Sequence, residues 1–502
     1  MKRIIPLLLA LIAAWPIHAK NITITVSKTK YQTITGFGAA ACDGAMCPFG
    51  SDTKPVQLLY GKQSKIGLNI MRMEISPSFS GESSSNYSWN GSLPSAKLVK
   101  QRGGIVFGTP WSPPGSYKTN GAANGGKAES QGQVKATLRD DCYEKFFPWL
   151  NTFLKWMKSK GVKVDAVSIQ NEPDWWVDYS GCLYTPQQQL NLVKNYAHLL
   201  DRETYPWVRL ISAEPLGFDP NYSNTLLNNS TARSQVDIIA GHLYGQAPLG
   251  NMKNANNLAS KYKKELWMTE HIMTKDIEGR LPNWSEQLEF AQELNESMQA
   301  GCTGYIYWYM RAHWSFVGTG ETRWGAENKR NVLLPRAYVM SHFSKHVTGS
   351  TRLNATATNV AIATGAPFQT TAYIKGDSII VMTINKSNTE YKVRVRLPYL
   401  VQSGTYLVST GNEKENLCQT SEIEITEPTK TVDIPIPVQS LNTFIFMLAD
   451  EETAIDEVDD EEIAMKGKTE QYDLQGRHTN LPNDGLYILR REDGTTRKLY
   501  KK

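Results

Sequence analysis

Val167-Ser168-Ile169-Gln170-Asn171-Glu172 and Leu266-Trp267-Met268-Thr269-Glu270 are two apolar, strand-like runs that each end in a glutamate. Burying a carboxylate at the end of a strand costs free energy unless the group is paired or has a function. In a (β/α)8 barrel, the carboxyl ends of the strands carry the active site. Two carboxylates in such places are typical of acid–base chemistry on a glycosidic bond. The two runs therefore predict both a fold and a chemistry.

Strand-like and helical runs alternate on both sides of these segments, from Lys30 to about Val347. This alternation implies parallel strands joined by right-handed crossovers, and eight such units fit a closed α/β barrel, the (β/α)8 or TIM barrel, better than an open sheet. We expect strands at Thr33–Ala39, Gly67–Met73, Gly104–Thr109, Val164–Asn171, Val208–Ala213, Val236–Leu243, Glu265–Thr269 and Gly304–Tyr309. Apolar residues recur with a helical period in Asp141–Lys160, Pro186–Glu203 and Trp284–Ala300.

Around Asn354 the pattern changes to short strands at hairpin spacing, which predicts an antiparallel β-sandwich attached to the barrel. The run Val393–Leu397 alternates strictly, so one face of that strand should meet water. The early run Ile22–Val26 also alternates and is expected to add a strand to the sandwich. The expected strands are Thr371–Lys375, Ser378–Asn385, Glu390–Leu397, Thr405–Ser409, Glu422–Thr426, Thr431–Pro435 and Asn442–Leu448.

The chain begins with features of a secretory signal peptide. Lys2 and Arg3 are followed by the apolar stretch Ile4–Trp15 and by the small-residue exit Ile17-His18-Ala19. No later run reaches the length of a membrane span. We therefore expect a secreted protein, extracellular or at the cell surface, with the periplasm as the alternative, and no membrane association.

The expected organisation follows from these patterns. It comprises a signal peptide (1–19), an N-terminal strand of the side domain (20–30), the barrel (31–347), the β-sandwich (348–449), an acidic linker (450–466) and a C-terminal β-module (467–502). The segment Asp459-Asp460-Glu461-Glu462 cannot bury much surface, which favours a flexible linker. The tail, with "DLQGR", "GLYI" and a basic end, resembles the C-terminal sorting domain of secreted Bacteroidetes proteins; otherwise it is a small terminal β-module without an export role.

Composition excludes some functions. A net charge of +5 over 502 residues, without a basic stripe, does not indicate nucleic-acid binding. The 13 Trp and 23 Tyr serve packing or offer flat surfaces to sugar rings, and both uses are expected. Of the six cysteines, Cys42 and Cys47 are close enough to bridge across a loop, whereas buried or free thiols are expected for Cys142, Cys182, Cys302 and Cys418. The spacing does not fit a zinc site, and we expect no metal or cofactor.

We assign Glu172 as the catalytic acid/base and Glu270 as the nucleophile. Barrels that hydrolyse glycosides with retention hold these two carboxyl groups roughly 5 Å apart. The donor must keep its proton near neutral pH, so burial or a neighbouring charge has to raise its pKa. The alternative, two structural carboxylates in salt bridges, is less attractive because each glutamate ends a conspicuous local motif.

Further side chains are candidates for binding substrate. The Asn171 amide would hold a sugar hydroxyl beside the reacting carbon, or else cap the strand end. Arg72 would keep Glu270 ionised and aimed; alternatively it pairs with Glu74 or Glu214, and the residues do not decide between these. Tyr244 is expected to hydrogen-bond the nucleophile.

Three more candidates lie in neighbouring motifs. His242, beside Tyr244, is either part of the site or a core histidine with satisfied hydrogen bonds, and the latter is the more common case. Trp111 and Trp308 are candidate platforms for sugar rings, although packing alone would explain one of them.

Together, the segments "GTPWSPPGSYKTNG", "SIQNEPD", "SGCLYTPQQ", "IIAGHLYG" and "LWMTEH" resemble glycoside hydrolase family 30. The resemblance runs from about Gln32 to Leu448, preserves motif order and is strongest to the glucuronoxylan-specific endo-xylanases. It implies a barrel with a side β-sandwich built from both chain ends. It also implies a retaining mechanism with Glu172 as acid/base and Glu270 as nucleophile.

This sequence departs from that subfamily where the glucuronate branch is bound. A Tyr two residues after the nucleophile is replaced by Ile272, and the second Arg of the strand-eight loop, which grips the branch carboxylate, is replaced by Ala312. Trp314 replaces a further Tyr. A guanidinium–carboxylate hydrogen bond contributes about 1.5–3 kcal/mol, so these losses predict weak or no dependence on the branch. Arg311 or His313 could substitute for the lost groups, and Arg311 is kept as a substrate-binding candidate.

The sequence thus predicts a monomeric, retaining endo-β-1,4-xylanase that acts on xylan or a related plant cell-wall polysaccharide. The alternatives are a glucuronate-dependent glucuronoxylanase, another β-glycanase or xylobiohydrolase of the same family, and a carbohydrate-binding protein on an inactive barrel.

Overall fold

A computed structural model of the chain describes residues 20–41, 52–77, 87–126, 136–273, 279–358, 360, 364–449, 456–457, 469–472, 485–491 and 496–501. The expected signal peptide, Cys42 and Cys47, most of the acidic linker and the "DLQGR" motif lie outside these residues. No helix in the part of the chain that the structure describes is long and apolar enough to span a membrane.

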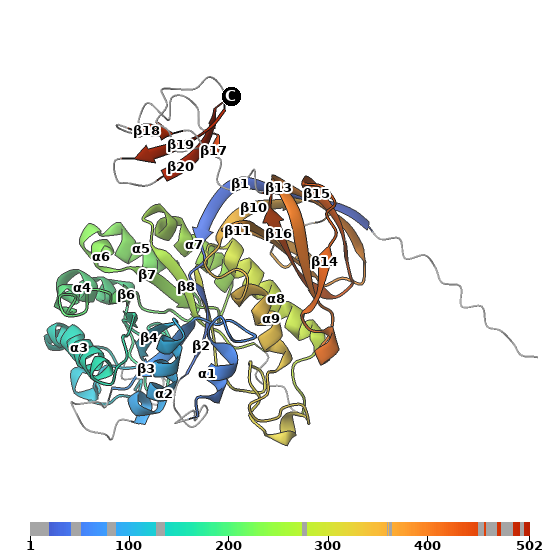
Figure 1. Cartoon of the computed structure of the whole chain (residues 1–502). Coiled ribbons are helices and arrows are strands. Elements are labelled where there is room, and N and C mark those ends of the chain that lie inside the picture. The colour runs from blue at the N-terminus through green and yellow to red at the C-terminus, as the bar shows by residue number, and fades with distance from the viewer. Residues whose placement is uncertain are drawn as a thin grey trace, which may run out of the picture.

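Within these residues, eight parallel strands close into a barrel, which confirms the predicted fold class. The strands are β2 (Gly36–Ala40), β3 (Ile70–Ile75), β4 (Ile105–Pro110), β5 (Ala166–Ser168), β6 (Arg209–Ile211), β7 (Ile238–His242), β8 (Glu265–Glu270) and β9 (Gly304–Tyr307). The helices α1 (Lys54–Leu59), α2 (Tyr87–Gln101), α3 (Tyr143–Ser159), α4 (Pro186–Tyr196), α5 (Pro220–Asn228), α6 (Ser230–Gln235), α7 (Pro248–Lys261), α8 (Trp284–Gln299) and α9 (Pro335–Ser344) surround it (Figure 1).

Local sequence explains where the helices begin and which face they bury. Thr185 and Gln188 form a reciprocal capping box at the start of α4, with Pro186 in the first turn, and Asn283 and Glu286 form the same box on α8. The apolar stripe predicted for α3, which includes Phe146, is buried against the barrel. The helix predicted to reach Glu203 instead ends at Tyr196 and continues as a short 3-10 turn.

The side chains inside the barrel form layers, and these layers determine where the charged residues lie. An apolar layer contains Phe107 and Trp267, whose rings meet edge-on with centroids 5.5 Å apart. Because side chains on one face of a strand recur every second residue, the next inward positions continue the same rows. Ile70 on β3 is followed two residues later by Arg72, and Ala240 on β7 is followed by His242. A charged layer therefore lies between the apolar core and the carboxyl ends of the strands.

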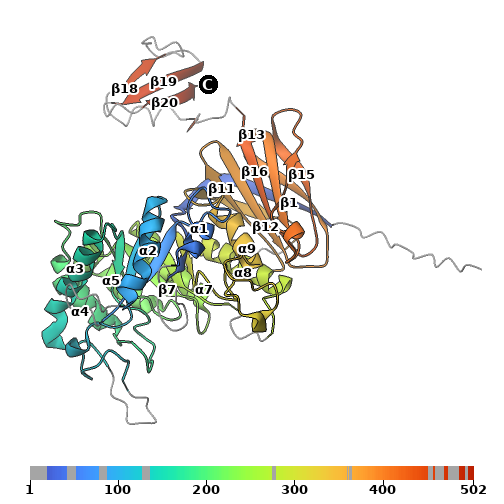
Figure 2. The same ribbon diagram turned by 60° about the horizontal axis from the view of Figure 1, so that its bottom comes forward.

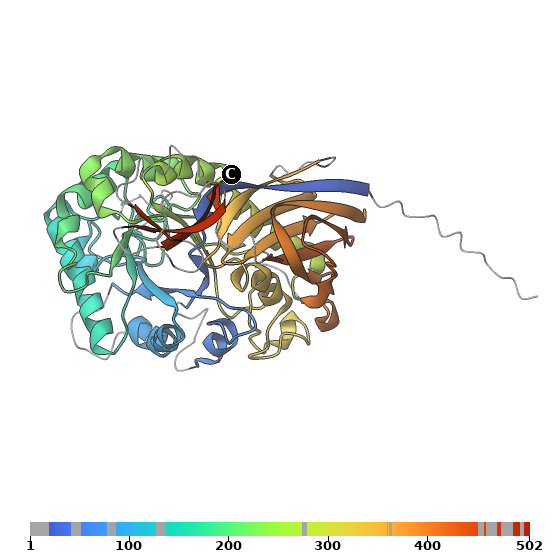
Figure 3. The same ribbon diagram turned by 45° about the horizontal axis from the view of Figure 1, so that its top comes forward.

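A second, mostly antiparallel sheet packs beside the barrel. Its strands are β1 (Lys20–Thr33), β10 (Thr351–Ala357), β11 (Phe368–Lys375), β12 (Ser378–Asn385), β13 (Tyr391–Ser409), β14 (Gln419–Ile423), β15 (Thr429–Ile436) and β16 (Ser440–Leu448). β1 pairs antiparallel with β10 and parallel with β13. Figure 3 shows β1, in blue, running along the orange strands from the far end of the sequence.

Two details of this sheet differ from the predictions. Residues 390–397 and 405–409 were expected as separate strands, but one continuous strand, β13, covers both. Its first part pairs with β15 and its second part with β16, with a register shift in between, so one strand serves two neighbours in turn. β10 was not predicted, because its alternation is weak and the change to hairpin spacing around Asn354 falls inside it.

Buried polar contacts join the side sheet to α8 and α9, which lie against it (Figure 2). His342 on α9 is bonded through Nδ1 to Thr443 Oγ1 at 2.8 Å and through Nε2 to Ser409 Oγ at 2.9 Å. Burial lowers the pKa of His342 to about 3, so the ring is neutral in this contact. Asn295 on α8 donates to Gln369 Oε1 at 3.0 Å. Since such groups lose water only when they are paired, these contacts fix the sheet on the barrel.

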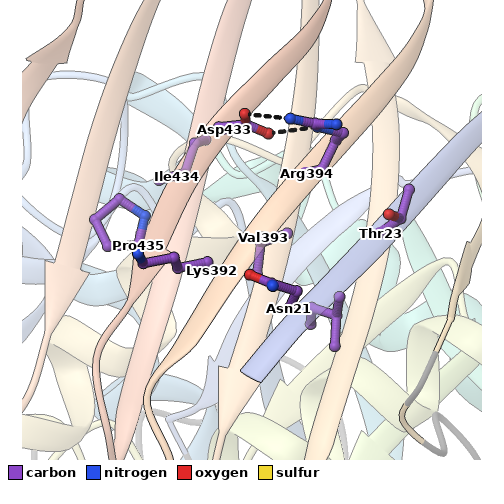
Figure 4. Close-up of a pocket in the computed structure, with 9 residues that line it drawn as sticks. Asn21, Thr23, Lys392, Val393, Arg394, Asp433, Ile434 and Pro435 are labelled. Atoms are coloured by element: carbon purple, nitrogen blue, oxygen red, sulfur yellow. Dashed lines mark hydrogen bonds and ion pairs between the residues drawn. The ribbon is translucent and has the colours of Figure 1, made fainter. Parts of the chain in front are cut away.

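The outer face of the side sheet carries a shallow hollow of about 470 Å³ between β1, β13 and β15 (Figure 4). Arg394 and Asp433 form a two-point ion pair across it, with N–O distances of 2.8 and 2.7 Å. The strands β17 (Asp456–Glu457), β18 (Thr469–Tyr472), β19 (Gly485–Arg491) and β20 (Thr496–Lys501) form a separate small sheet.

Candidate active site

Glu172 and Glu270 lie together at the carboxyl ends of their strands. Both side chains belong to residues that are only 8% exposed. One carboxylate oxygen of Glu172, one of Glu270 and a ring nitrogen of His242 lie within 4.8 Å of one another. This spacing suits two carboxyl groups that share one anomeric carbon in a retaining reaction, where the separation is about 5–5.5 Å.

Glu172 leaves its strand in an unusual backbone conformation. Its φ angle is +42°, a left-handed conformation that costs free energy for a residue with a side chain. Its amide N–H donates to the Glu214 carbonyl at 3.0 Å, and the Asn171 amide donates to the Pro110 carbonyl at 2.9 Å. The ends of β4 and β6 thus hold the turn in which Glu172 sits.

Arg72 connects the charged groups of the site. Its Nη1 lies 2.5 Å from Glu270 Oε2, and its Nη2 lies 2.7 Å from Asn171 Oδ1 and 3.0 Å from Glu214 Oε2. The sequence left open whether Arg72 serves the nucleophile or a structural carboxylate, and the structure shows that it contacts both. Arg72 is fully buried, so its guanidinium meets Glu270 and Asn171 and has no exposed surface of its own.

His242 links Glu172 to Glu214. Its Nδ1 lies 3.0 Å from Glu172 Oε1 and its Nε2 lies 3.4 Å from Glu214 Oε2. Burial alone would lower the pKa of His242, but the carboxylates of Glu270, Glu172 and Glu214 outweigh burial and raise it to about 9. The ring is thus an imidazolium at neutral pH, with no exposed surface for binding substrate.

Glu214 is a third buried carboxylate, which the sequence suggested only as a possible partner of Arg72. Burial alone would raise its pKa, but Arg72 and His242 lower it to about 2. Thr109 Oγ1 also donates to Glu214 Oε1 at 2.8 Å. The signal was present in the sequence, because Leu210-Ile211-Ser212-Ala213-Glu214 is another apolar run that ends in glutamate.

The charges beneath the two glutamates do not cancel. Arg72 and the His242 imidazolium carry two positive charges against the single negative charge of Glu214, so these three groups carry a net positive charge. Burial raises the pKa of Glu270, against the opposing effects of His242 and Arg72, and the Glu172 carboxylate adds to the increase.

Tyr244 and two tryptophans complete the surroundings of Glu270. Tyr244 OH donates to Glu270 Oε1 at 3.2 Å, and burial raises the pKa of this phenol well above its usual range, so it stays a donor. The Trp111 ring lies 4.6 Å from the Arg72 guanidinium, and the Trp308 ring lies 5.7 Å from it. Trp111 is nearly buried, whereas Trp308 keeps partial exposure.

The loop after β9, the eighth strand of the barrel, does not bring its basic side chains to the carboxylates. Arg311 Nη2 is bonded to Asp52 Oδ2 at 2.6 Å and to Asn331 Oδ1 at 2.5 Å. His313 stacks on Trp324 with ring centroids 3.6 Å apart and planes inclined by 7°. The proposed substrate-binding role of Arg311 therefore has no support in its contacts, because the side chain is already held by two oxygen partners.

Glu172, His242 and Glu270 also form a group of donor atoms with the spacing of a metal site within the described residues. Their bonding argues for a different use. Both nitrogens of His242 face carboxylates, so the ring acts as a double donor and has no lone pair for a metal. Glu270 is already neutralised by Arg72. The donor set thus suits proton transfer better than ligation.

Comparisons with known proteins found similarity over most of the chain. Residues 34–314 match the model of the glycosyl hydrolase family 30 TIM-barrel domain. The glucuronoxylanase XynC of Bacillus subtilis is 28% identical over 446 residues, which are 85% of this chain and 92% of that protein. The family 30 subfamily 8 xylanase Xyn30A of Clostridium acetobutylicum superposes with a TM-score of 0.67 at 29% identity, covering 85% of this chain and 99% of that one. An endoxylanase of Clostridium papyrosolvens gives 0.68 at 27% identity, with 85% and 100% covered.

Proposed function

This chain belongs to glycoside hydrolase family 30, and on that premise we propose that it is a retaining endo-β-1,4-xylanase that needs no glucuronate branch. The observation that carries the proposal is the pair of carboxylate oxygens within 4.8 Å at the carboxyl ends of β5 and β8. The choice of xylan rests on similarity to xylanases over 85% of this chain.

In the proposed reaction, Glu270 attacks the anomeric carbon while Glu172 gives its proton to the glycosidic oxygen. The carbon–oxygen bond breaks, the leaving sugar departs with that proton, and a glycosyl ester forms on Glu270. Glu172, now ionised, takes a proton from water, and the resulting nucleophile displaces Glu270 with net retention. The intact pair of glutamates and the adjacent Asn171 disfavour a purely carbohydrate-binding protein.

We assign the role of proton donor to Glu172 and the role of nucleophile to Glu270. Glu270 accepts hydrogen bonds from two donors, Arg72 and Tyr244, which hold its carboxylate in one orientation. Glu172 accepts from His242 through Oε1, and its other oxygen remains for the proton. The transfer then needs no rearrangement of the charged layer beneath the two groups.

Independence from glucuronate is supported by three replacements and two engaged side chains. Ile272, Ala312 and Trp314 stand where the resembling glucuronoxylanases bind the branch. Arg311 is held by Asp52 and Asn331, and His313 is stacked on Trp324. A branch carboxylate would need one of these two groups to leave its partners, at a cost comparable to the bond it would gain.

Side-by-side digestion tests this proposal. The enzyme should cleave unbranched xylan and glucuronoxylan at rates within about threefold of each other, since a lost charged hydrogen bond removes selectivity of about tenfold or more. Proton NMR of the first products should show the β-anomer before mutarotation. Strong preference for glucuronoxylan would contradict branch independence, cleavage restricted to β-1,6-linked glucan would contradict the xylanase assignment, and an initial α-anomer would contradict the mechanism.

We also propose that the protein is exported, on the basis of its charged and apolar start. Expression of the full-length chain in a secreting bacterium should give an extracytoplasmic protein whose N-terminus lies near Lys20. Recovery of uncleaved protein from the cytoplasm would contradict the proposal.

A further inference from the structure

The loop that follows Glu172 exposes two large aromatic side chains. Among the described residues, Trp175 is 51% exposed and Tyr179 is 54% exposed, more than any other large apolar side chain. Both lie within seven residues of Glu172 on one loop. Large aromatic side chains are usually buried, and two exposed on the same loop indicate a surface that is covered when a ligand binds.

The first part of this loop is tied to the strand ends that carry the carboxylates. The Trp175 amide donates to the Glu172 carbonyl at 3.1 Å, which closes a tight turn directly after the glutamate. The Asp174 carboxylate accepts from the Leu216 amide at 2.9 Å, two residues beyond Glu214. Trp175 is therefore anchored beside Glu172.

The second aromatic residue lies within electrostatic reach of the site. Partial burial raises the pKa of Tyr179 to about 12, and the carboxylates of Glu172 and Glu270 contribute to the increase. By its place in the chain, Tyr179 stands on the same loop as Trp175, seven residues after Glu172.

This loop is held against the loop after β4 by a ladder of backbone hydrogen bonds. Gly125 donates to the Tyr179 carbonyl at 2.8 Å, and Gly181 donates to the Ala123 carbonyl at 3.1 Å. A Cβ atom on Gly125 would lie 2.1 Å from the Val177 carbonyl oxygen, so only glycine permits this approach. The aromatic side chains therefore stand on a fixed support.

Lys118 ties the same two loops together from inside. This lysine is almost completely buried, and its Nζ lies 3.0 Å from the Ala123 carbonyl oxygen, 2.6 Å from that of Asn124 and 2.5 Å from that of Gly181. An ammonium group has three N–H donors, and here each has one carbonyl acceptor. Lys118 is a positioning residue for the loop that carries Trp175 and Tyr179.

We propose that Trp175 and Tyr179 form the platform for the sugar rings on the leaving-group side of the cleaved bond. The inference rests on the proposed function, in which Glu172 protonates the leaving oxygen. Because that proton must reach the glycosidic oxygen, the exposed rings on the loop of Glu172 lie beside the departing chain. Xylose carries no hydroxymethyl group, so its C–H faces lie flat on an aromatic ring. Trp111 and Trp308 are grouped around Arg72, which contacts Glu270, and are not part of the proposed platform.

The test compares two substrates that differ in the leaving group. Xylohexaose places sugars on the proposed platform, whereas β-xylobiosyl fluoride has a single atom as its leaving group. In the full-length double variant W175A/Y179A, the ratio of kcat/KM for xylohexaose to kcat/KM for the fluoride should fall at least about fivefold. The ratio cancels differences in active fraction. Y31A, which removes an exposed aromatic side chain on β1, is the matched control and should leave the ratio unchanged.

Two outcomes for the double variant would overturn the platform. One is an unchanged ratio, and the other is an equal loss on both substrates, which would indicate general damage or a role on the opposite side. A parent enzyme that hydrolyses neither substrate would instead refute the proposed function, so the two failures are distinguishable. Thermal unfolding of each variant checks that the exposed rings are not required for folding.

Discussion

Two of the arginine–carboxylate arrangements among the described residues have similar geometry but opposite surroundings. In the barrel, Arg72 lies 2.5 Å from Glu270 and 3.0 Å from Glu214, and the side chains are between 0% and 10% exposed. On the side sheet, Arg394 lies 2.7 Å from Asp433, with the two side chains 53% and 63% exposed (Figure 4). Distance alone does not distinguish the two contacts.

The difference shows that burial makes each charge of an ion pair depend on its protein partners. The exposed pair gains little, because water screens it and solvates each partner equally well when it is broken. The buried cluster has lost that water, so each charge depends on its protein partners, and removing one leaves another uncompensated. The same dependence shifts the pKa of His242 up and that of Glu214 down, which keeps both charged around neutral pH.

The largest expected effect is on kcat, and it should differ between the carboxylate of the barrel and that of the side sheet. E270Q should lower kcat on xylan by about 10,000-fold or more, because the amide cannot form the glycosyl ester. D433N removes the carboxylate of the exposed pair and should leave kcat within about twofold. Initial rates on unbranched xylan measure both. Substantial activity in E270Q, or a comparable loss in D433N, would remove the distinction.

Removing the arginine of the buried cluster should be the next largest effect. R72A leaves Glu214 and Glu270 without their guanidinium, which should lower the free energy of unfolding by about 3–5 kcal/mol. Denaturant unfolding monitored by tryptophan fluorescence measures the change. R394A is the matched arginine deletion in the exposed pair. If both variants lost equal stability, burial would not be the deciding factor.

The pH dependence of stability should report His242. Its pKa of about 9 in the folded protein lies above its ordinary value of 6.5. The stabilisation from the imidazolium contacts is therefore fully present below pH 6.5 and is lost as pH rises through 9, on the order of 3 kcal/mol. H242Q should lack this alkaline loss, whereas H198Q, a change outside the barrel interior, should retain it. Unfolding curves at intervals between pH 6 and 10 measure the slopes, and parallel slopes in H242Q and the parent would contradict the assignment.

Glu214 should determine how stability falls on the acidic side of the same pH curve. Its pKa of about 2 lies below its ordinary value of 4.5, so its contribution is fully present above pH 4.5 and is lost as pH falls through 2. Stability from this cluster should thus be greatest between about pH 4.5 and 6.5.

Loss of the internal lysine tests a buried charge whose side-chain hydrogen bonds, within the described residues, all go to backbone carbonyl groups. K118M leaves three carbonyl groups without their shared donor, and we expect unfolding to become easier by about 2 kcal/mol. Because the loop of Trp175 and Tyr179 loosens, the xylohexaose-to-fluoride ratio should also fall. K194M, a change at an exposed lysine on α4, is the control. A stability loss with an unchanged ratio would mean that Lys118 supports the fold but not the platform.

The smallest effect concerns the exposed pair itself. R394A should leave the midpoint of denaturant unfolding almost unchanged, and added salt should shrink any difference further. Unfolding in low and high sodium chloride measures it. A shift as large as that of R72A would show that the hollow on the side sheet is more than a solvated surface.

Much of the fold was predictable because its signals are local. Apolar runs of strand length placed all eight barrel strands, although β5 and β6 are shorter than the runs that predicted them. The single strand β13 was not predictable in the same way. Its two parts read as separate strands, and only the partners on either side, β15 and β16, make it continuous.

The same distinction between local signals and distant partners applies to the residues of the candidate site. Glu172 and Glu270 follow from sequence alone, because a glutamate that ends an apolar run is a local signal. The bridging role of Arg72 depends on residues from three other strands, and no local pattern encodes which of them it reaches. Glu214 carried the same strand-end signal as the other two glutamates. It was considered only as a pairing partner, because one charged neighbour was enough to explain it.

The central claim is that Glu270 forms a covalent bond with the sugar while Glu172 supplies the proton. A 2-deoxy-2-fluoroxylobioside with a dinitrophenolate leaving group slows the second step and should trap that bond. We expect inactivation with one xylobiosyl unit added per chain, and peptide mass spectrometry should place it on Glu270 in the segment Leu266–His271. Attachment to another residue, or turnover without any covalent species together with inversion at the anomeric carbon, would contradict the account.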